Sequence, residues 1–116
     1  MIVIKSPLEL DAMRRVARLT ARVRDELAAM VRPGITTLDL GNAAFDLTRK
    51  LGGVSAFYGY HGFPGQICVS VNDEVVHGIP GPRILRDGDI VSIDVGVCFE
   101  GFIGDTAITV AAGEIS

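Results

Sequence analysis

The first part of the chain has the hydrophobic spacing of a long amphipathic helix. Ser6-Pro7-Leu8-Glu9 combines an N-cap serine, a proline at the first helical position and a glutamate that closes a capping box. Pro33-Gly34 then stops the helix. Between these two signals, apolar or small residues recur in alternating steps of three and four, which is the period of one helix face, at positions 13, 16, 20, 23, 27 and 30.

A second, shorter helix is predicted after the Pro-Gly pair. Thr36 or Thr37 caps its start, and Gly52-Gly53 ends it. One face of this helix carries the apolar residues Leu40, Ala44, Leu47 and Leu51. Each helix therefore has one apolar stripe, which another layer of structure must cover.

The second half of the chain supplies that layer as β-structure. A short strand is predicted over 67–71, whereas 72–89 holds turn residues and two prolines. The stretch SIDVGVCFEGFIGDTA, residues 92–107, reads as two strands that flank the turn pair Glu100-Gly101. This order predicts an α+β fold, with two helices packed on an antiparallel sheet, in a single domain over residues 1–116.

The hairpin fixes the relative positions of two aspartates. A two-residue turn pairs residues whose numbers sum to 201, so Asp94 faces Ala107 and Asp105 faces Gly96. Because side chains alternate between the faces of a strand, both aspartates lie on one face, as diagonal neighbours about 7–8 Å apart at the backbone. The opposite face is predicted to form the core, with Val91, Ile93, Val95, Val97, Phe99, Phe102, Ile108 and Val110.

The face that carries the aspartates is otherwise lined by small residues: Ser92, Gly96, Cys98, Ala107 and Thr109. Two nearby carboxylates repel each other unless a cation or a shared proton compensates them. One interpretation is a site for a divalent cation, because hard oxygen ligands suit Mg, Mn, Ca, Fe, Co and also Zn. The other is one edge carboxylate and one turn-capping carboxylate without a ligand. Two carboxylates do not complete a metal site, so further ligands must come from elsewhere.

Composition narrows the class of protein. Apolar residues make up 48% of the 116 residues, which excludes a disordered chain, and no apolar run is long enough to cross a membrane. The beginning of the chain does not read as a signal peptide, and two cysteines favour a reduced, cytoplasmic setting. A net charge of −3 argues against a nucleic-acid surface. The mean hydropathy of +0.38 indicates apolar surface meant for a partner.

The two histidines of the chain lie in distinctive loops. GYHGFP, residues 59–64, places Tyr60, His61 and Phe63 among glycines, either as a loop packed under aromatics or as an apolar pocket wall with a polar tip. NDEVVHGIP, residues 72–80, places His77 before a Gly-x-Pro turn. His77 is either a surface residue or, near a carboxylate-bound metal, a donor to a substrate carbonyl.

In this order, the segments GYHGFP, NDEVVHGIP, DGDIVSIDVGV and GFIGDT resemble those of the type I methionine aminopeptidases, over the whole chain. The resemblance implies half of the pita-bread fold, in which two related α+β halves hold a dinuclear metal site between them. It implies a hydrolase that removes N-terminal methionine from peptides and nascent proteins. The implied cofactors are two divalent ions per complete site, Co, Mn, Fe or Zn, and the ligand types do not select among them.

The resemblance also implies roles for individual residues. Asp94 and Asp105 are two of the five metal ligands, and His77 is the catalytic histidine that contacts the substrate. His61 is similar to the histidine beside the metals. The walls of the methionine side-chain pocket are Tyr60, Phe63 and Cys68.

The remaining ligands of the family, one histidine and two glutamates, have no counterpart in the 116 residues. A second half-domain or a second copy of the chain is therefore the implied partner, beside the substrate peptide. Four interpretations stay open: a fragment, one subunit of a split enzyme, a self-pairing homodimer, and a non-catalytic half-fold that binds peptides or a partner protein. In a homodimer, a two-fold axis brings the aspartates of both copies together. The expected function is a half-enzyme with low or assembly-dependent aminopeptidase activity.

Overall fold

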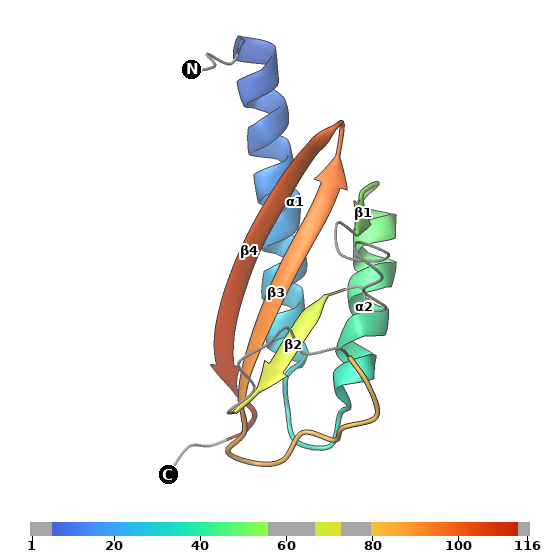
Figure 1. Ribbon diagram of the computed structural model, residues 1–116, viewed down its shortest axis with the longest axis vertical. Helices are drawn as coiled ribbons and strands as arrows, with labels where there is room; N and C mark the ends of the chain where they lie inside the picture. The colour runs from blue at the N-terminus through green and yellow to red at the C-terminus, as the bar shows by residue number, and fades with distance from the viewer. Residues whose placement is uncertain (1–5, 56–66, 73–79, 114–116) are drawn as a thin grey trace.

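The two helices lie on one side of a four-stranded antiparallel sheet in the computed structural model, which describes residues 6–55, 67–72 and 80–113 (Figure 1). Strand β3 is central, since β4 pairs along one of its sides, while β1 and β2 pair along the other. This arrangement confirms the predicted α+β fold. The elements are α1 Pro7–Met30, α2 Thr37–Lys50, β1 Val54–Ser55, β2 Cys68–Val71, β3 Ile90–Phe99 and β4 Phe102–Ala111.

Helix α1 begins at the predicted capping box. The Glu9 backbone N–H donates to Ser6 Oγ at 3.2 Å, and the Ser6 N–H donates to Glu9 Oε1 at 3.1 Å. The helix ends at Met30, and its buried stripe consists of Ala12, Val16, Thr20, Val23 and Leu27.

The predicted inner position of Met13 is wrong, because its side chain is 40% exposed and Ala12 is buried instead. The first turns of α1 extend past the end of the hairpin, so no sheet covers them there (Figure 1).

Helix α2 is capped by Thr36, the first of the two predicted candidates. The Asp39 N–H donates to Thr36 Oγ1 at 3.0 Å, and Asp39 Oδ2 accepts from the Thr36 N–H at 2.9 Å. Thr37 is the first helical residue, and its backbone N–H donates to the Arg83 carbonyl at 3.0 Å. Leu40 and Ala44 are buried against the core as predicted.

The long hairpin has the predicted register. Glu100 and Gly101 both adopt positive φ, 52° and 81°, as both central residues of a type I′ turn require. Asp94 pairs with Ala107 and Gly96 pairs with Asp105, in a ladder of ten residue pairs without a bulge. The hairpin tip is joined to α1 by Arg15, whose guanidinium donates to both carboxylate oxygens of Glu100 at 2.9 and 2.8 Å.

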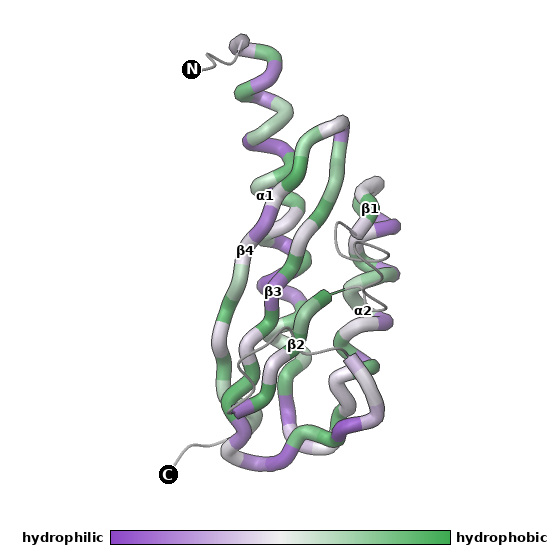
Figure 2. Tube along the Cα trace, viewed as in Figure 1, coloured by the Kyte–Doolittle hydropathy of each residue, from purple (hydrophilic) through white to green (hydrophobic). Residues whose placement is uncertain are grey.

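The core lies between the helices and the helix-facing side of the sheet. Apolar residues recur along β3 and β4 in Figure 2, and four predicted core residues of β3 are fully buried: Val91, Ile93, Val95 and Val97. Phe99, also predicted for the core, is only half-buried at the hairpin end. Strand β1 was not predicted, because its two residues are too few to show a period. Its position depends on pairing of Val54 and Ser55 with the distant Cys98 and Val97.

Asp89 organises the turn that leads into β3. Its carboxylate accepts from the Arg86 backbone N–H at 2.9 Å and from Asn72 Nδ2 at 3.0 Å. These hydrogen bonds, the one from the Arg86 backbone first, lower the pKa of Asp89 below its ordinary value. Asn72 in turn accepts from the Ile90 N–H at 2.8 Å, which connects the end of β2 to the start of β3.

The lowered pKa of Asp89 predicts an acid-sensitive contribution to stability. A carboxyl group whose pKa is lower in the folded chain stabilises it above the unfolded pKa of about 3.9, and this contribution is lost as the pH falls through the folded value. Asp89→Asn should therefore lower the melting temperature at pH 7 and reduce the further drop between pH 5 and pH 3. Asp46→Asn, at an exposed position of α2, is the control. Equal acid-induced drops in Asp89→Asn and the unmodified chain would contradict the prediction.

Candidate functional site

The sheet has one face that the helices do not cover, and both predicted aspartates lie on it. The residues of β3 and β4 that alternate with the buried core positions point to this side. We call this surface the aspartate face and define it by Cys68, Ser70, Ser92, Asp94, Gly96, Cys98, Ile103, Asp105, Ala107 and Thr109.

Three strands contribute to the centre of the aspartate face. Asp94 of β3 lies between Cys68 of β2 and Ala107 of β4 in one row of the sheet. Asp105 lies in the next row, opposite Gly96, so the two carboxylates are diagonal neighbours roughly 7–8 Å apart at the backbone. Asp94 is half-buried, with its Oδ1 atom buried, whereas Asp105 is exposed. The predicted common face is therefore confirmed.

Cys68 lies opposite Asp94 in the sheet, at the border of the aspartate pair, and its side chain is buried. It is only 6% exposed, and burial raises the pKa of its thiol to about 11, with further contributions from the negative charges of Asp94 and Asp105. At neutral pH the thiol is therefore protonated and uncharged. A neutral, weakly polar sulfur next to two carboxylates is suited to the wall of an apolar pocket.

The thiol also reports on the two carboxylates. In the metal-free chain, the double substitution Asp94→Asn and Asp105→Asn removes both negative charges, so the Cys68 pKa should fall toward its ordinary value. Iodoacetamide should then modify Cys68 faster at pH 8, because the thiolate is the reactive form. The measurement uses a Cys98→Ser background so that one thiol is followed, with Asp46→Asn as the control. An unchanged rate would show that burial alone sets the thiol pKa.

The donor chemistry of the aspartate face fits a divalent cation in part. Two carboxylates supply hard oxygen ligands, and the residues opposite them in the sheet, Gly96 and Ala107, carry no side chain or only a methyl group. Within residues 6–55, 67–72 and 80–113, no group of three or more His, Cys, Asp or Glu side chains is arranged to hold a metal. The other predicted site residues, Tyr60, His61, Phe63 and His77, lie outside the described residues.

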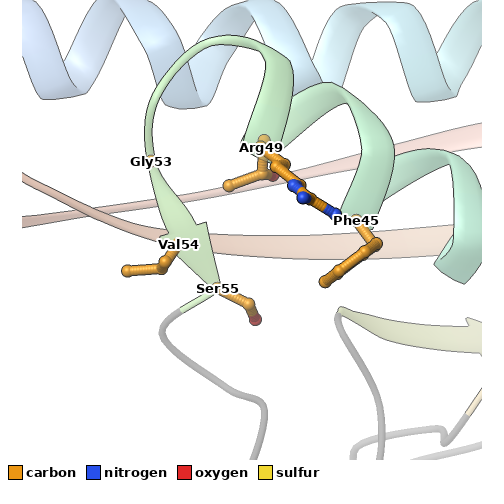
Figure 3. Close-up of a pocket in the computed structure, with 6 residues that line it drawn as sticks. Phe45, Arg49, Gly53, Val54 and Ser55 are labelled. Atoms are coloured by element: carbon orange, nitrogen blue, oxygen red, sulfur yellow. The ribbon is translucent and has the colours of Figure 1, made fainter.

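Two hollows on the surface were not predicted from the sequence. One, of about 250 Å³, lies where α2 meets β1, and there Phe45 and Arg49 face Val54 and Ser55 (Figure 3). The only sequence signal for it is Phe45, an aromatic residue off the apolar stripe of α2 that is 45% exposed. The other, of about 390 Å³, lies between α1 and β4, and Asp105 is among its lining residues.

The chain belongs to metallopeptidase family M24, whose family model it matches over residues 11–116. Among curated proteins, it is 49% identical over its full length to methionine aminopeptidase 1 of Bacillus subtilis and 46% identical to the methionine aminopeptidase of Clostridium perfringens. In both cases it covers 47% of the relative. The chain thus spans about half the length of these relatives, and the predicted family resemblance is confirmed.

Solved structures agree with this assignment. The methionine aminopeptidases of Rickettsia prowazekii and Thermotoga maritima superpose on the whole chain with TM-scores of 0.95 and 0.93, at 35% and 39% identity, and the chain covers 47% of each. An Xaa-Pro dipeptidase from Bacillus anthracis shares the fold, with a TM-score of 0.80 at 24% identity. The predicted half of a pita-bread fold is therefore confirmed. Within the described part of the chain, neither helix combines the length and the apolar character needed to span a bilayer.

Proposed function

We propose that the chain forms one half of a metal-dependent aminopeptidase that removes N-terminal methionine from peptides and nascent proteins in the cytoplasm. The observation that carries the proposal is the pair Asp94 and Asp105 on the sheet face opposite the helices, in a chain of family M24. The similarity to methionine aminopeptidases supports the choice of N-terminal methionine as substrate.

Asp94 and Asp105 would hold the divalent ions, two per complete site and chosen among Co, Mn, Fe and Zn. When bound, such ions polarise the carbonyl of the first peptide bond and activate water. The reaction consumes one water molecule. A new C–O bond forms at the methionine carbonyl, the C–N bond breaks, and the leaving amine takes up a proton.

The other residues bind the substrate and stabilise developing charge. The protonated Cys68 thiol would form one wall of the methionine side-chain pocket, since it is uncharged at neutral pH. By resemblance, Tyr60 and Phe63 form other walls and His61 lies beside the metals. His77 would donate a hydrogen bond to the carbonyl oxygen as negative charge develops on it, which is the catalytic role we assign to it.

The ligand set is incomplete in this chain. Two aspartates leave coordination positions that other donors must fill, and the chain spans about half the length of its relatives. We therefore assign the missing ligands to a second half-domain or to a second copy of the chain. Activity should depend on that assembly and should be low for the chain alone.

The decisive experiment measures methionine release from a Met-Ala-Ser peptide by the Mn- or Co-loaded 116-residue chain. We expect slow release by the chain alone and faster release after addition of the C-terminal half of the Bacillus subtilis relative. His77→Ala should lower the turnover of this mixture by about 10²–10³-fold while leaving Mn binding unchanged. If metal neither binds nor raises the melting temperature, the proposal fails and a non-catalytic binding module is the better description.

A further inference from the structure

The segment that leads into β3 is bound to the start of α2. Residues 80–85 run past the first turn of this helix before the chain reaches the strand (Figure 1). The Thr37 backbone N–H donates to the Arg83 carbonyl at 3.0 Å, and Thr36 and Ile84 form an antiparallel bridge. The two stretches are therefore joined by backbone hydrogen bonds outside the main sheet.

The Thr37 side chain adds a second connection, to Gly81. Its hydroxyl donates to the Gly81 carbonyl at 3.1 Å and accepts from the Gly81 N–H at 2.8 Å. The Leu38 N–H donates to the same carbonyl at 2.8 Å. Thr37 is only 4% exposed, and shielding from water strengthens such hydrogen bonds. Both backbone polar groups of Gly81 are thus held by the first turn of α2.

Pro80 packs on the same helix one turn further along. Gly41 follows Thr37 by four residues, so both lie on one face of α2. A Cβ atom added at Gly41 would lie 3.0 Å from Pro80 Cβ and 3.2 Å from its Cγ. The lack of a side chain at Gly41 is therefore what lets the proline ring approach the helix. Shape and hydrogen bonds together fix Pro80 and Gly81 on α2.

Pro80 ends the sequence motif that contains His77. The histidine precedes Pro80 by three residues in NDEVVHGIP and itself lies outside the described residues. At the other end of the motif, the Asn72 N–H donates to the Ile90 carbonyl at 2.8 Å. A group that donates to a developing oxyanion must lie about 2.7–3.1 Å from it, and a misplacement of about 1 Å can cost about 10²-fold in rate. Such a group needs supporting residues that fix its position.

We propose that Thr37 is a positioning residue for His77, through its hydrogen bonds to Gly81. The inference rests on the proposed function, because it assigns Thr37 to the support of the catalytic histidine. Thr37 lies on α2, whereas Asp94 and Asp105 lie on the sheet face opposite the helices. Loss of the Thr37 hydroxyl should therefore lower turnover and leave metal binding unchanged.

The experiment measures methionine release from a Met-Ala-Ser peptide by the Mn-loaded mixture of the 116-residue chain and the C-terminal half of the Bacillus subtilis relative. Thr37→Val keeps the shape of the side chain and removes the hydroxyl. It should lower kcat by about 10–100-fold with a smaller change in KM, while calorimetry shows unchanged Mn²⁺ affinity. Thr37→Ser retains the hydroxyl and should keep most of the turnover. Thr48→Val, at another buried threonine of α2, is the control.

Gly41→Ala tests the contact with Pro80 without loss of helix stability. Alanine is a better helix former than glycine, but its Cβ would press the proline away by a few tenths of an ångström. Turnover should fall severalfold while the melting temperature changes little. Asn42→Ala, at the exposed neighbouring position, gives the gain in helix propensity without the contact and should keep full turnover. These two variants decide the question if Thr37→Val does not fold.

A double substitution shows whether Thr37 acts through His77. In the His77→Ala background, Thr37→Val should lower turnover little further, because the group that it positions is absent. Hydrogen exchange on the chain alone gives a readout that does not depend on activity. The Gly81 amide should exchange faster in Thr37→Val, since it loses its acceptor, whereas amides of the β3–β4 hairpin should be unchanged.

Several results would overturn the positioning role and leave the proposed function in place. They are equal losses of turnover in both backgrounds, full turnover despite faster Gly81 exchange, unchanged Gly81 exchange, and a loss of Mn²⁺ affinity that parallels the loss of turnover. In each of them the unmodified mixture still releases methionine. An unmodified mixture that releases none would remove the proposed function, and the role of Thr37 with it.

Discussion

Replacement of Asp94 by asparagine should weaken Mn²⁺ binding by at least about 100-fold, since even residues that only orient a metal ligand cost 10–100-fold in affinity. The substitution preserves the shape of the side chain and removes its charge. Asp94 is the more enclosed of the two carboxylates, in a row between Cys68 and Ala107. A neutral amide there leaves Asp105 as the one anionic oxygen donor among the residues that define the aspartate face. The measurement is isothermal titration of the metal-free chain with Mn²⁺.

Two matched variants distinguish a ligand from a general charge effect. Asp46→Asn makes the same change at an exposed position of α2, and Ser92→Ala alters the aspartate face one row away. Ser92 Oγ and Thr109 Oγ1 are 2.9 Å apart there and share a hydrogen bond. Both variants should bind Mn²⁺ with nearly unchanged affinity. Unchanged affinity in Asp94→Asn would contradict the metal role of the pair.

Gly104→Val should have the largest effect on folding stability. Gly104 lies on the buried side of β4, where α1 approaches so closely that an added Cβ would overlap Thr20 Oγ1 and lie 3.0 Å from the Val16 carbonyl oxygen. Overpacking of this kind costs about 1–3 kcal/mol, and each kcal/mol lowers the melting temperature of a domain of this size by roughly 4–8 °C. The measurement is thermal and urea unfolding of the metal-free chain.

A second variant shows whether the contact with Thr20 is responsible. Thr20→Ala removes the hydroxyl, which itself donates to the Val16 carbonyl at 2.6 Å. Gly104→Ala should therefore be less destabilising in the Thr20→Ala background than in the unmodified chain, with the remainder due to the helix backbone. Ala107→Val, on the other face of the same strand, should change stability little. Equal effects of Gly104→Ala in both backgrounds would mean that the sheet shifts as a whole and that the hydroxyl is not the obstacle.

Local signals were enough to predict the helices, the hairpin and the face of the sheet that carries both aspartates. Each helix start depends on residues three positions apart, as in Ser6 and Glu9, so neighbouring residues contain the information. The register of β3 and β4 follows from the two residues of the turn, because a type I′ turn fixes which residues face each other. The family resemblance added the expected roles, which register alone does not provide.

Features that depend on contacts between distant parts of the chain could not be predicted in the same way. The exposure of Met13 depends on how far α1 extends past the hairpin, and the row formed by Cys68 and Asp94 depends on the pairing of β2 with β3. Sequence periodicity records which side of an element is apolar, but not which element covers it. The hollow beside Asp105 exists only because α1 and β4 pack together.

The sequence by itself determined that two carboxylates share one face of a hairpin and that this chain resembles a metal-dependent aminopeptidase. Among the described residues, tertiary structure decided that both helices lie on the opposite face, that Cys68 borders the aspartates, and that β4 lies at the margin of the sheet next to a hollow. The physical reason is the separation along the chain of the residues that interact. Turn geometry and side-chain alternation act between neighbours along the chain, whereas burial and the place of a strand in the sheet are set by which distant segments pack together.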